Sequence, residues 1–215
     1  MSNLKLTSTD GELFENPSLY HSIADSLQYL TMTKHELAYL VNKVCHFMQQ
    51  SQKSHWKSVK RILRYLQGSL TLGLDFQPAP SFKLTSYIDS DWASDIEDRK
   101  STSSFCVYFG SNLISWSSQK QASVSRSSTE AEYRGVCNLA TELLTINKLL
   151  FEIHITLHVP MIYCDNQGAM LMATNPVQHS RSKHFETDLH FLRDHIAKGR
   201  LQVTHIPSDA QWQTL

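Results

Sequence analysis

The chain has 215 residues, of which 41% are hydrophobic and 19% are charged. This composition is typical of a globular protein that buries a core, and it excludes an intrinsically disordered chain. Lys and Arg together number 20, as do Asp and Glu, so the net charge of zero gives no whole-chain indication of a nucleic-acid or membrane partner.

Neither the cysteines nor the N-terminal sequence indicates a secreted or membrane protein. The cysteines are far apart among apolar neighbours and form no C-x-x-C pair, so we expect reduced thiols in a core. The first 20 residues lack the pattern of a signal peptide, and no run approaches the ~20 apolar residues of a membrane span. The sequence therefore predicts no membrane association and a cytoplasmic or nuclear location. The cysteines are Cys45, Cys106, Cys137 and Cys164.

The first third of the chain is predicted to be helical. Between Pro17 and about Leu66, apolar residues recur at intervals of three and four. Two prolines then indicate a linker near residues 76–82. We therefore predict two domains, a small helical segment at residues 1–80 and a second domain at residues 81–215.

The second domain begins with three short strands. Residues 83–89, 101–109 and 112–119 are rich in β-branched and aromatic residues, and a tight turn at Gly110 joins the second strand to the third. The element order β-β-β-α-β-α-α-β predicts an α/β fold whose sheet starts as an antiparallel meander. The later elements are predicted at residues 128–153 (helix), 160–165 (strand), 166–174 and 183–199 (helices) and 201–207 (strand).

Three acidic residues are predicted to lie near one another. Asp89 is at the end of the first strand, Glu132 is in the first turn of the long helix, and Asp165 follows the apolar strand. In a mixed α/β sheet, ligands gather where strand ends meet helix N-termini. Three carboxylates that converge there would bind a cation.

Each acidic residue also has a structural explanation that the spacing leaves open. Asp89 and Asp91 lie two apart and share one face of a strand, which could simply be its solvated face. Glu132 stands three residues after Thr129, as in a capping box, and Asp165 could be the N-cap of the following helix. None of these positions identifies a metal site by itself.

Five blocks of sequence follow one another along the chain: YIDSDWASD, RKSTSSFCVYFG, LISWSSQKQASVSRSSTEAEYRG, YCDNQGA and SRSKHFETDLHFLRD. In order and spacing they resemble the ribonuclease H domain at the end of the Pol polyprotein of copia-type LTR retrotransposons. The leading half is similar to the C-terminal connection segment of reverse transcriptase, and nothing matches the polymerase motif. The resemblance implies a ribonuclease H-like mixed five-stranded sheet with flanking helices, preceded by a small helical segment.

The resemblance also implies an activity. The family is a Mg²⁺-dependent endonuclease that hydrolyses the RNA strand of RNA–DNA hybrids, and its metal-binding catalytic residues fall on Asp89, Glu132 and Asp165. Two Mg²⁺ ions are implied as cofactors, since a pair of ions can stabilise both the attacking and the leaving oxygen. The implied partners are the hybrid and the reverse transcriptase and integrase portions of a polyprotein.

Two groups of side chains are candidates for contacts with nucleic acid. Polar residues between the third strand and the long helix could contact 2′-hydroxyl groups, and basic residues along one helix of the leading half could follow phosphates. Loop polarity and a solvated helix face explain the two groups as well. The first group is Ser118, Gln119, Gln121, Ser127 and Ser128, and the second is Lys57, Lys60, Arg61 and Arg64.

The C-terminal sequence departs from the family pattern. The family continues past its last strand with a pattern like DQLAD, whose final aspartate is a fourth metal ligand, whereas this chain reads SDAQWQTL. Alignment on Gln211 puts Thr214 at the place of that aspartate, and a hydroxyl is a weaker ligand for Mg²⁺ than a carboxylate. We therefore expect a C-terminally truncated domain. Two functions stay open, the ribonuclease and a weakened or inactive remnant that keeps the fold and binds nucleic acid.

Overall fold

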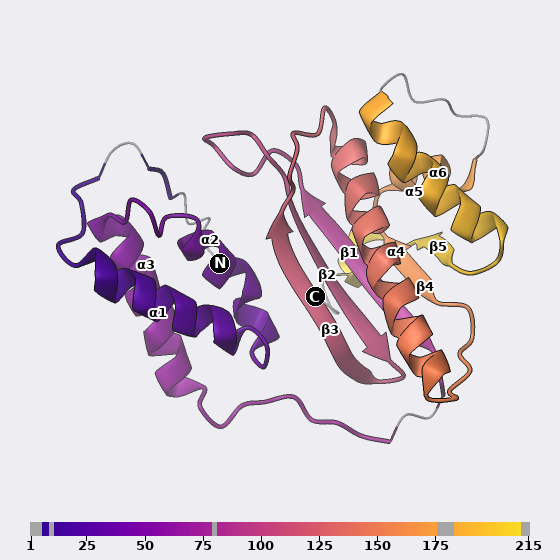
Figure 1. Ribbon diagram of the computed structural model, residues 1–215, viewed down its shortest axis with the longest axis horizontal. Helices are drawn as coiled ribbons and strands as arrows, with labels where there is room; N and C mark the ends of the chain where they lie inside the picture. The colour runs from indigo at the N-terminus through magenta and orange to yellow at the C-terminus, as the bar shows by residue number, and fades with distance from the viewer. Residues whose placement is uncertain (1–5, 9–10, 79–80, 176–182, 212–215) are drawn as a thin grey trace. The chain divides into compact units, whose positions relative to one another are not determined.

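The chain divides into two compact units, each with its own hydrophobic core. Unit 1 is Met1–Leu74 and unit 2 is Asp75–Leu215, whereas the sequence placed the boundary at residues 80 and 81. Figure 1 shows both units. The computed structural model describes residues 6–8, 11–78, 81–175 and 183–211.

Unit 1 is helical, as predicted. The side chain of Asn16 accepts a hydrogen bond from the Leu19 N–H and so caps the first helix. Apolar faces of the three longer helices meet in one core, to which each contributes fully buried side chains such as Tyr20, Val41 and Val59. The elements are α1 (Pro17–Leu30), the 3₁₀ turn η1 (His35–Leu37), α2 (Ala38–Cys45) and α3 (Lys53–Gly68).

Unit 2 is built on a mixed five-stranded sheet in the order β3-β2-β1-β4-β5. The first three strands pair antiparallel, and the last two join the sheet in parallel, β4 beside β1 and β5 beside β4. This is the ribonuclease H-like arrangement that the sequence predicted, so the fold prediction is confirmed. The strands are β1 (Leu84–Asp91), β2 (Thr102–Phe109), β3 (Asn112–Lys120), β4 (Met161–Cys164) and β5 (Gln202–His205).

The longest helix of unit 2, α4 (Ser128–Glu152), crosses one face of the sheet (Figure 1). It packs on β1, β2 and β4, and Val136 joins Ile88 and Ile162 in the core. A Cβ at Gly135 would stand 2.7 Å from Ser90 Oγ, so glycine is needed where α4 approaches the end of β1. The other helices are α5 (Gln167–Thr174), α6 (Lys183–Ala197) and α7 (Ser208–Gln211), and the sequence did not predict the last one. Of the helices described, none has the length and hydropathy to cross a membrane.

All four cysteines are free thiols. Cys106, Cys137 and Cys164 are buried in unit 2, and Cys45 is half-buried in unit 1. The expectation of reduced thiols in the core therefore holds for the three in unit 2, and Cys45 lies at the border of the core of unit 1.

Candidate functional site

The structure brings together Asp89, Glu132 and Asp165 from three separate elements. β1 and β4 run parallel with Ile88 opposite Cys164, so the next residues, Asp89 and Asp165, lie side by side. Glu132 reaches them from the second turn of α4. The three carboxyl groups are close enough for the charge of Asp165 to act on both of the others.

Glu132 is almost completely buried, although its side chain is ionisable. It is 4% exposed, and its Oε1 accepts a hydrogen bond of 2.7 Å from the Ser90 N–H. The thiol of Cys164 donates to Oε2 at 3.7 Å. Burial, with the nearby charges of Asp89 and Asp165, raises the pKa of Glu132 to about 8, although the Ser90 N–H acts in the opposite direction.

Asp89 and Asp91 share a strand face but differ in environment. Asp91 is exposed, whereas Asp89 is half-buried. Burial, then the charges of Asp165 and Asp91, raise the pKa of Asp89 above its usual range. The interpretation of a uniformly solvated face therefore fits Asp91 and does not fit Asp89.

The capping explanation for Glu132 is wrong. The N-cap of α4 is Ser127, whose Oγ accepts a hydrogen bond of 3.1 Å from the Glu130 N–H. Glu130 in turn accepts from the Arg126 N–H at 3.0 Å. The hydrogen bonds at the start of α4 therefore use Ser127 and Glu130 rather than Thr129 and Glu132, which leaves Glu132 free to point toward the strand ends.

The capping explanation for Asp165 is also wrong. The N-cap of α5 is Asn166, whose side chain accepts a hydrogen bond of 3.0 Å from the Ala169 N–H. Because the neighbouring residue caps the helix, Asp165 is not needed for that task. Its Oδ2 instead accepts a hydrogen bond of 2.8 Å from Ser208 Oγ.

Several residues of the site were not found from the sequence. Ser208 stands 43 residues after Asp165, and the carbonyl oxygen of Asp165 lies 3.1 Å from the Nε2 of His205. Cys164 is adjacent to Asp165 in the sequence, yet its apolar neighbours gave it only the prediction of a core thiol. The sequence contains no signal for Ser208 or His205, because their proximity arises from the pairing of β4 with β5.

The polar candidates for nucleic-acid contact divide into buried and exposed residues. Gln121 is 7% exposed, and its Nε2 donates at 2.8 Å to both Ser103 Oγ and the Ala131 carbonyl oxygen. Ser118 is also buried and accepts a hydrogen bond from another serine. Both therefore have structural roles. The exposed members of the group are Gln119, Ser127 and Ser128.

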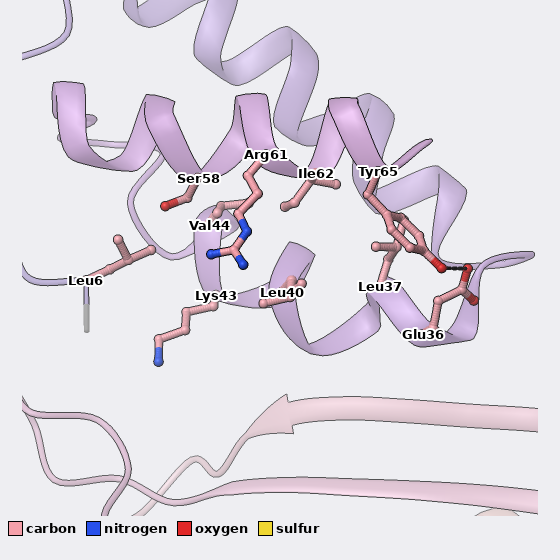
Figure 2. A pocket seen from close by; sticks show the side chains of 10 residues that line it. All are labelled: Leu6, Glu36, Leu37, Leu40, Lys43, Val44, Ser58, Arg61, Ile62 and Tyr65. Atoms are coloured by element: carbon pink, nitrogen blue, oxygen red, sulfur yellow. Dashed lines mark hydrogen bonds between the residues drawn. The ribbon is translucent and has the colours of Figure 1, made fainter. Parts of the chain in front are cut away.

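The basic candidates lie on the exposed face of α3. Lys57, Lys60, Arg61 and Arg64 are all exposed, whereas Val59, Ile62 and Leu66 on the opposite face are buried. Figure 2 shows Arg61 beside a groove of about 240 Å³ between α2 and α3, with Lys43 across it. The floor of the groove is apolar, and Tyr65 donates a hydrogen bond of 3.2 Å to Glu36 at one end. Exposure fits both explanations of this face, a phosphate track and a solvated helix surface.

The predicted position of the fourth ligand, Thr214, lies outside the described residues. Among the residues that precede it, Asp209 is exposed on α7. The absence of a fourth carboxylate ligand therefore stays a prediction from the sequence.

Comparisons with known proteins identify the relatives of the chain. It is 45% identical over 208 residues to the retrovirus-related Pol polyprotein from transposon RE2 of Arabidopsis thaliana and 44% identical to that from transposon RE1. The matching polyprotein from transposon TNT 1-94 of Nicotiana tabacum is 34% identical over 191 residues. These matches cover 96%, 96% and 88% of this chain but 14% of each polyprotein. No family model matches.

Solved structures add little to this likeness. LC11-RNase H1, isolated from compost, is 14% identical over 61% of this chain and 89% of that chain, with a TM-score of 0.45. A similarity of that degree supports no conclusion, and the strand order described above carries the fold assignment. From the polyprotein relatives, the chain belongs to the retrovirus-related Pol polyproteins of copia-type transposons, of whose length it spans 14%.

Proposed function

We propose that unit 2 hydrolyses the RNA strand of RNA–DNA hybrids with Mg²⁺ held by Asp89, Glu132 and Asp165. The convergence of these three carboxyl groups at the ends of β1 and β4 is the observation that supports it most strongly. The polyprotein relatives support a nucleic-acid substrate and an association with reverse transcriptase and integrase portions of a longer chain. A cytoplasmic or nuclear location is part of the same proposal.

The chemistry of the donor set fits magnesium. Mg²⁺ takes oxygen ligands and keeps several waters, and the three residues offer carboxylate oxygens. Burial and mutual repulsion raise the pKa of Asp89 and Glu132, so a cation at this place would favour their charged forms. A pair of such ions would supply an activated water and stabilise the leaving oxygen.

The residues around the carboxylates hold them in place. The Ser90 N–H fixes Glu132 Oε1, and the hydroxyl of Ser208 fixes Asp165 Oδ2. Ordered ligands lose little entropy when a cation binds, and their hydrogen-bond partners also set their orientation. At the N-terminus of α4, the exposed hydroxyls of Ser127 and Ser128 are donors for 2′-hydroxyl contacts with the hybrid.

The test compares Asp165, which follows β4, with Asp91, the last residue of β1. The purified chain is incubated with a labelled RNA–DNA hybrid and Mg²⁺, beside Asp165→Asn and Asp91→Asn variants. We expect Asp165→Asn to slow cleavage by at least about 100-fold, because one carboxylate ligand is lost, and Asp91→Asn to change it by less than about threefold. A DNA duplex of the same sequence serves as the substrate control and should stay intact. Equal products from wild type and Asp165→Asn would contradict the assignment.

The exposed basic face of α3 is compatible with a second candidate, a nucleic-acid-binding remnant without turnover. In that case the chain should bind the hybrid in Mg²⁺ without cutting it, and affinity should fall as salt rises. A Lys60→Gln/Arg64→Gln variant should then bind more weakly and show a smaller salt dependence. Cleavage by wild type that Asp165→Asn abolishes would exclude this candidate.

A further inference from the structure

Cys164 places a sulfur atom beside two of the proposed magnesium ligands. Its side chain is fully buried at the end of β4, and Sγ lies 3.7 Å from Glu132 Oε2. The sulfur and one carboxylate oxygen each from Glu132 and Asp165 all lie within 4.8 Å of one another. The proposed hydrolysis makes no use of this sulfur, because Mg²⁺ prefers oxygen ligands.

The separation of the sulfur and the Glu132 oxygen suits a tetrahedral metal ion. Zinc binds a thiolate sulfur at about 2.3 Å and a carboxylate oxygen at about 2.1 Å, so two such ligands of one tetrahedral ion lie about 3.6 Å apart. The observed separation is 3.7 Å. One carboxylate oxygen of Asp165 lies within 4.8 Å of both of these atoms, so the same ion can take it as a third ligand. Three protein ligands and one water would complete a zinc site of the open type.

Each of the three ligands receives a hydrogen bond from a group outside the cluster. Such bonds orient metal ligands. The donors are the Ser90 N–H to Glu132 Oε1 (2.7 Å), the Asn166 N–H to Cys164 Sγ (3.4 Å) and the Ser208 hydroxyl to Asp165 Oδ2 (2.8 Å).

We propose that Cys164, Glu132 and Asp165 form a binding site for a thiophilic divalent cation of the zinc type. When the sulfur–metal bond forms, the S–H bond breaks and its proton passes to solvent. Thiolate ligands favour zinc-like ions over Mg²⁺, so Cys164 gives the site a second metal specificity. Because Glu132 and Asp165 would serve both ions, the thiophilic ion displaces Mg²⁺ and inhibits hydrolysis. That inhibition rests on the proposed function, whereas the binding itself does not.

The test measures metal binding in the absence of hybrid. Cd²⁺ is the probe, because its bond to a thiolate gives an ultraviolet charge-transfer absorption that carboxylates and imidazoles do not give. The full chain is titrated with Cd²⁺ beside Cys164→Ser and Cys106→Ser variants, with circular dichroism as the check on folding. Cys106 is the matched control, since it is another buried thiol of unit 2 and lies on β2 away from the carboxylates.

We expect wild type and Cys106→Ser to develop the same absorption at one equivalent of Cd²⁺. Cys164→Ser should lose this absorption and bind Cd²⁺ at least about tenfold more weakly. Excess Mg²⁺ should reverse the wild-type signal. Absorption that persists in Cys164→Ser, or that disappears in Cys106→Ser, would overturn the proposal.

A second variant covers the case in which Cys164→Ser does not fold. Glu132→Gln keeps every cysteine and should weaken the Cd²⁺ signal at least about tenfold, because one oxygen ligand becomes a neutral amide. An unchanged signal in this variant would also overturn the proposal. The hydrolysis and the thiophilic site can be refuted separately. A cysteine-dependent Cd²⁺ signal without cleavage of the hybrid would refute only the hydrolysis. Mg²⁺-dependent cleavage without the Cd²⁺ signal would refute only the thiophilic site.

Discussion

Unit 1 and unit 2 each bury an ionisable side chain, but they surround it differently. In unit 1, His55 is fully buried, its Nδ1 accepts a hydrogen bond of 3.1 Å from the Gln52 N–H, and its Nε2 lies 3.0 Å from the Thr7 carbonyl oxygen. A neutral imidazole satisfies both contacts, with the proton on Nε2. In unit 2, Glu132 has two other carboxyl groups as neighbours. Both side chains are buried, so burial does not distinguish them. Glu132 differs from His55 because other carboxyl groups lie around it.

The two units also differ in charge, which the neutral total conceals. Unit 1 contains eight Lys and Arg against five Asp and Glu, and unit 2 contains twelve against fifteen. The excess of acidic residues is thus in the unit with the proposed cation site, and the excess of basic residues is in the unit with the exposed α3 face. The net charge of zero is therefore the sum of a net charge of +3 on unit 1 and −3 on unit 2.

The largest expected effect tests the structural role of His55. A His55→Phe variant keeps the ring that stacks on Phe47, with 4.0 Å between ring centres, but it leaves the Gln52 N–H and the Thr7 carbonyl without a partner. We expect the free energy of unfolding of unit 1 to fall by about 4 kcal/mol, as two polar groups lose their hydrogen bonds. Denaturant unfolding with amide hydrogen exchange of α1 to α3 measures it.

An exposed histidine provides the control for this change. His21→Phe on α1 should alter the free energy of unfolding by no more than about 0.5 kcal/mol. A loss below about 1 kcal/mol in His55→Phe would show that the buried imidazole contributes little, and the contrast between the two units would disappear.

The next effect tests the charged surroundings of Glu132 through pH. The unfolded chain releases the proton of this carboxyl near its ordinary pKa of 4.5, whereas the folded chain retains it until about pH 8. Between these values the folded state binds more protons, so the free energy of unfolding falls as pH rises. We expect a loss of about 3 kcal/mol from pH 5 to pH 8 without divalent cations, measured by denaturant unfolding at each pH.

A Glu132→Gln variant and added Mg²⁺ test whether Glu132 causes this pH dependence. The variant should remove most of the pH dependence, because the amide does not titrate, and Asp89, whose pKa is also raised, should account for the remainder. Saturating Mg²⁺ should stabilise wild type at pH 8 and have little effect on the variant. A wild-type stability that is flat or rises across this range would contradict the assigned surroundings of Glu132.

The smallest effect concerns the start of α4, which positions Glu132. Ser127→Ala should destabilise unit 2 by about 1 kcal/mol, because the Glu130 N–H loses its capping acceptor. Thr129→Ala, at the position that the sequence pattern suggested for the cap, should cost less. Thermal unfolding of the two variants side by side measures the difference, and a larger loss from Thr129→Ala would contradict the observed cap.

Much of the fold could be predicted from local patterns. The alternation of residues 83–89 marked β1, and the spacing of apolar residues marked α1 to α3, because each pattern reflects which side of an element faces the core. The four-residue helix α7 was missed, since a single turn has too few residues to show a period. The boundary between the units was placed late because prolines mark a linker but do not show where packing stops.

The sequence by itself determined the order of the elements and the three acidic positions, Asp89, Glu132 and Asp165. Only the tertiary structure decided how those acids are arranged, by pairing Ile88 with Cys164 and by giving the caps of α4 and α5 to Ser127 and Asn166. Cys164 and Ser208 joined the site for the same reason. Periodicity records which side of a helix or strand is buried, whereas the approach of charged groups depends on how separate elements pack, and that packing raises the pKa of Glu132.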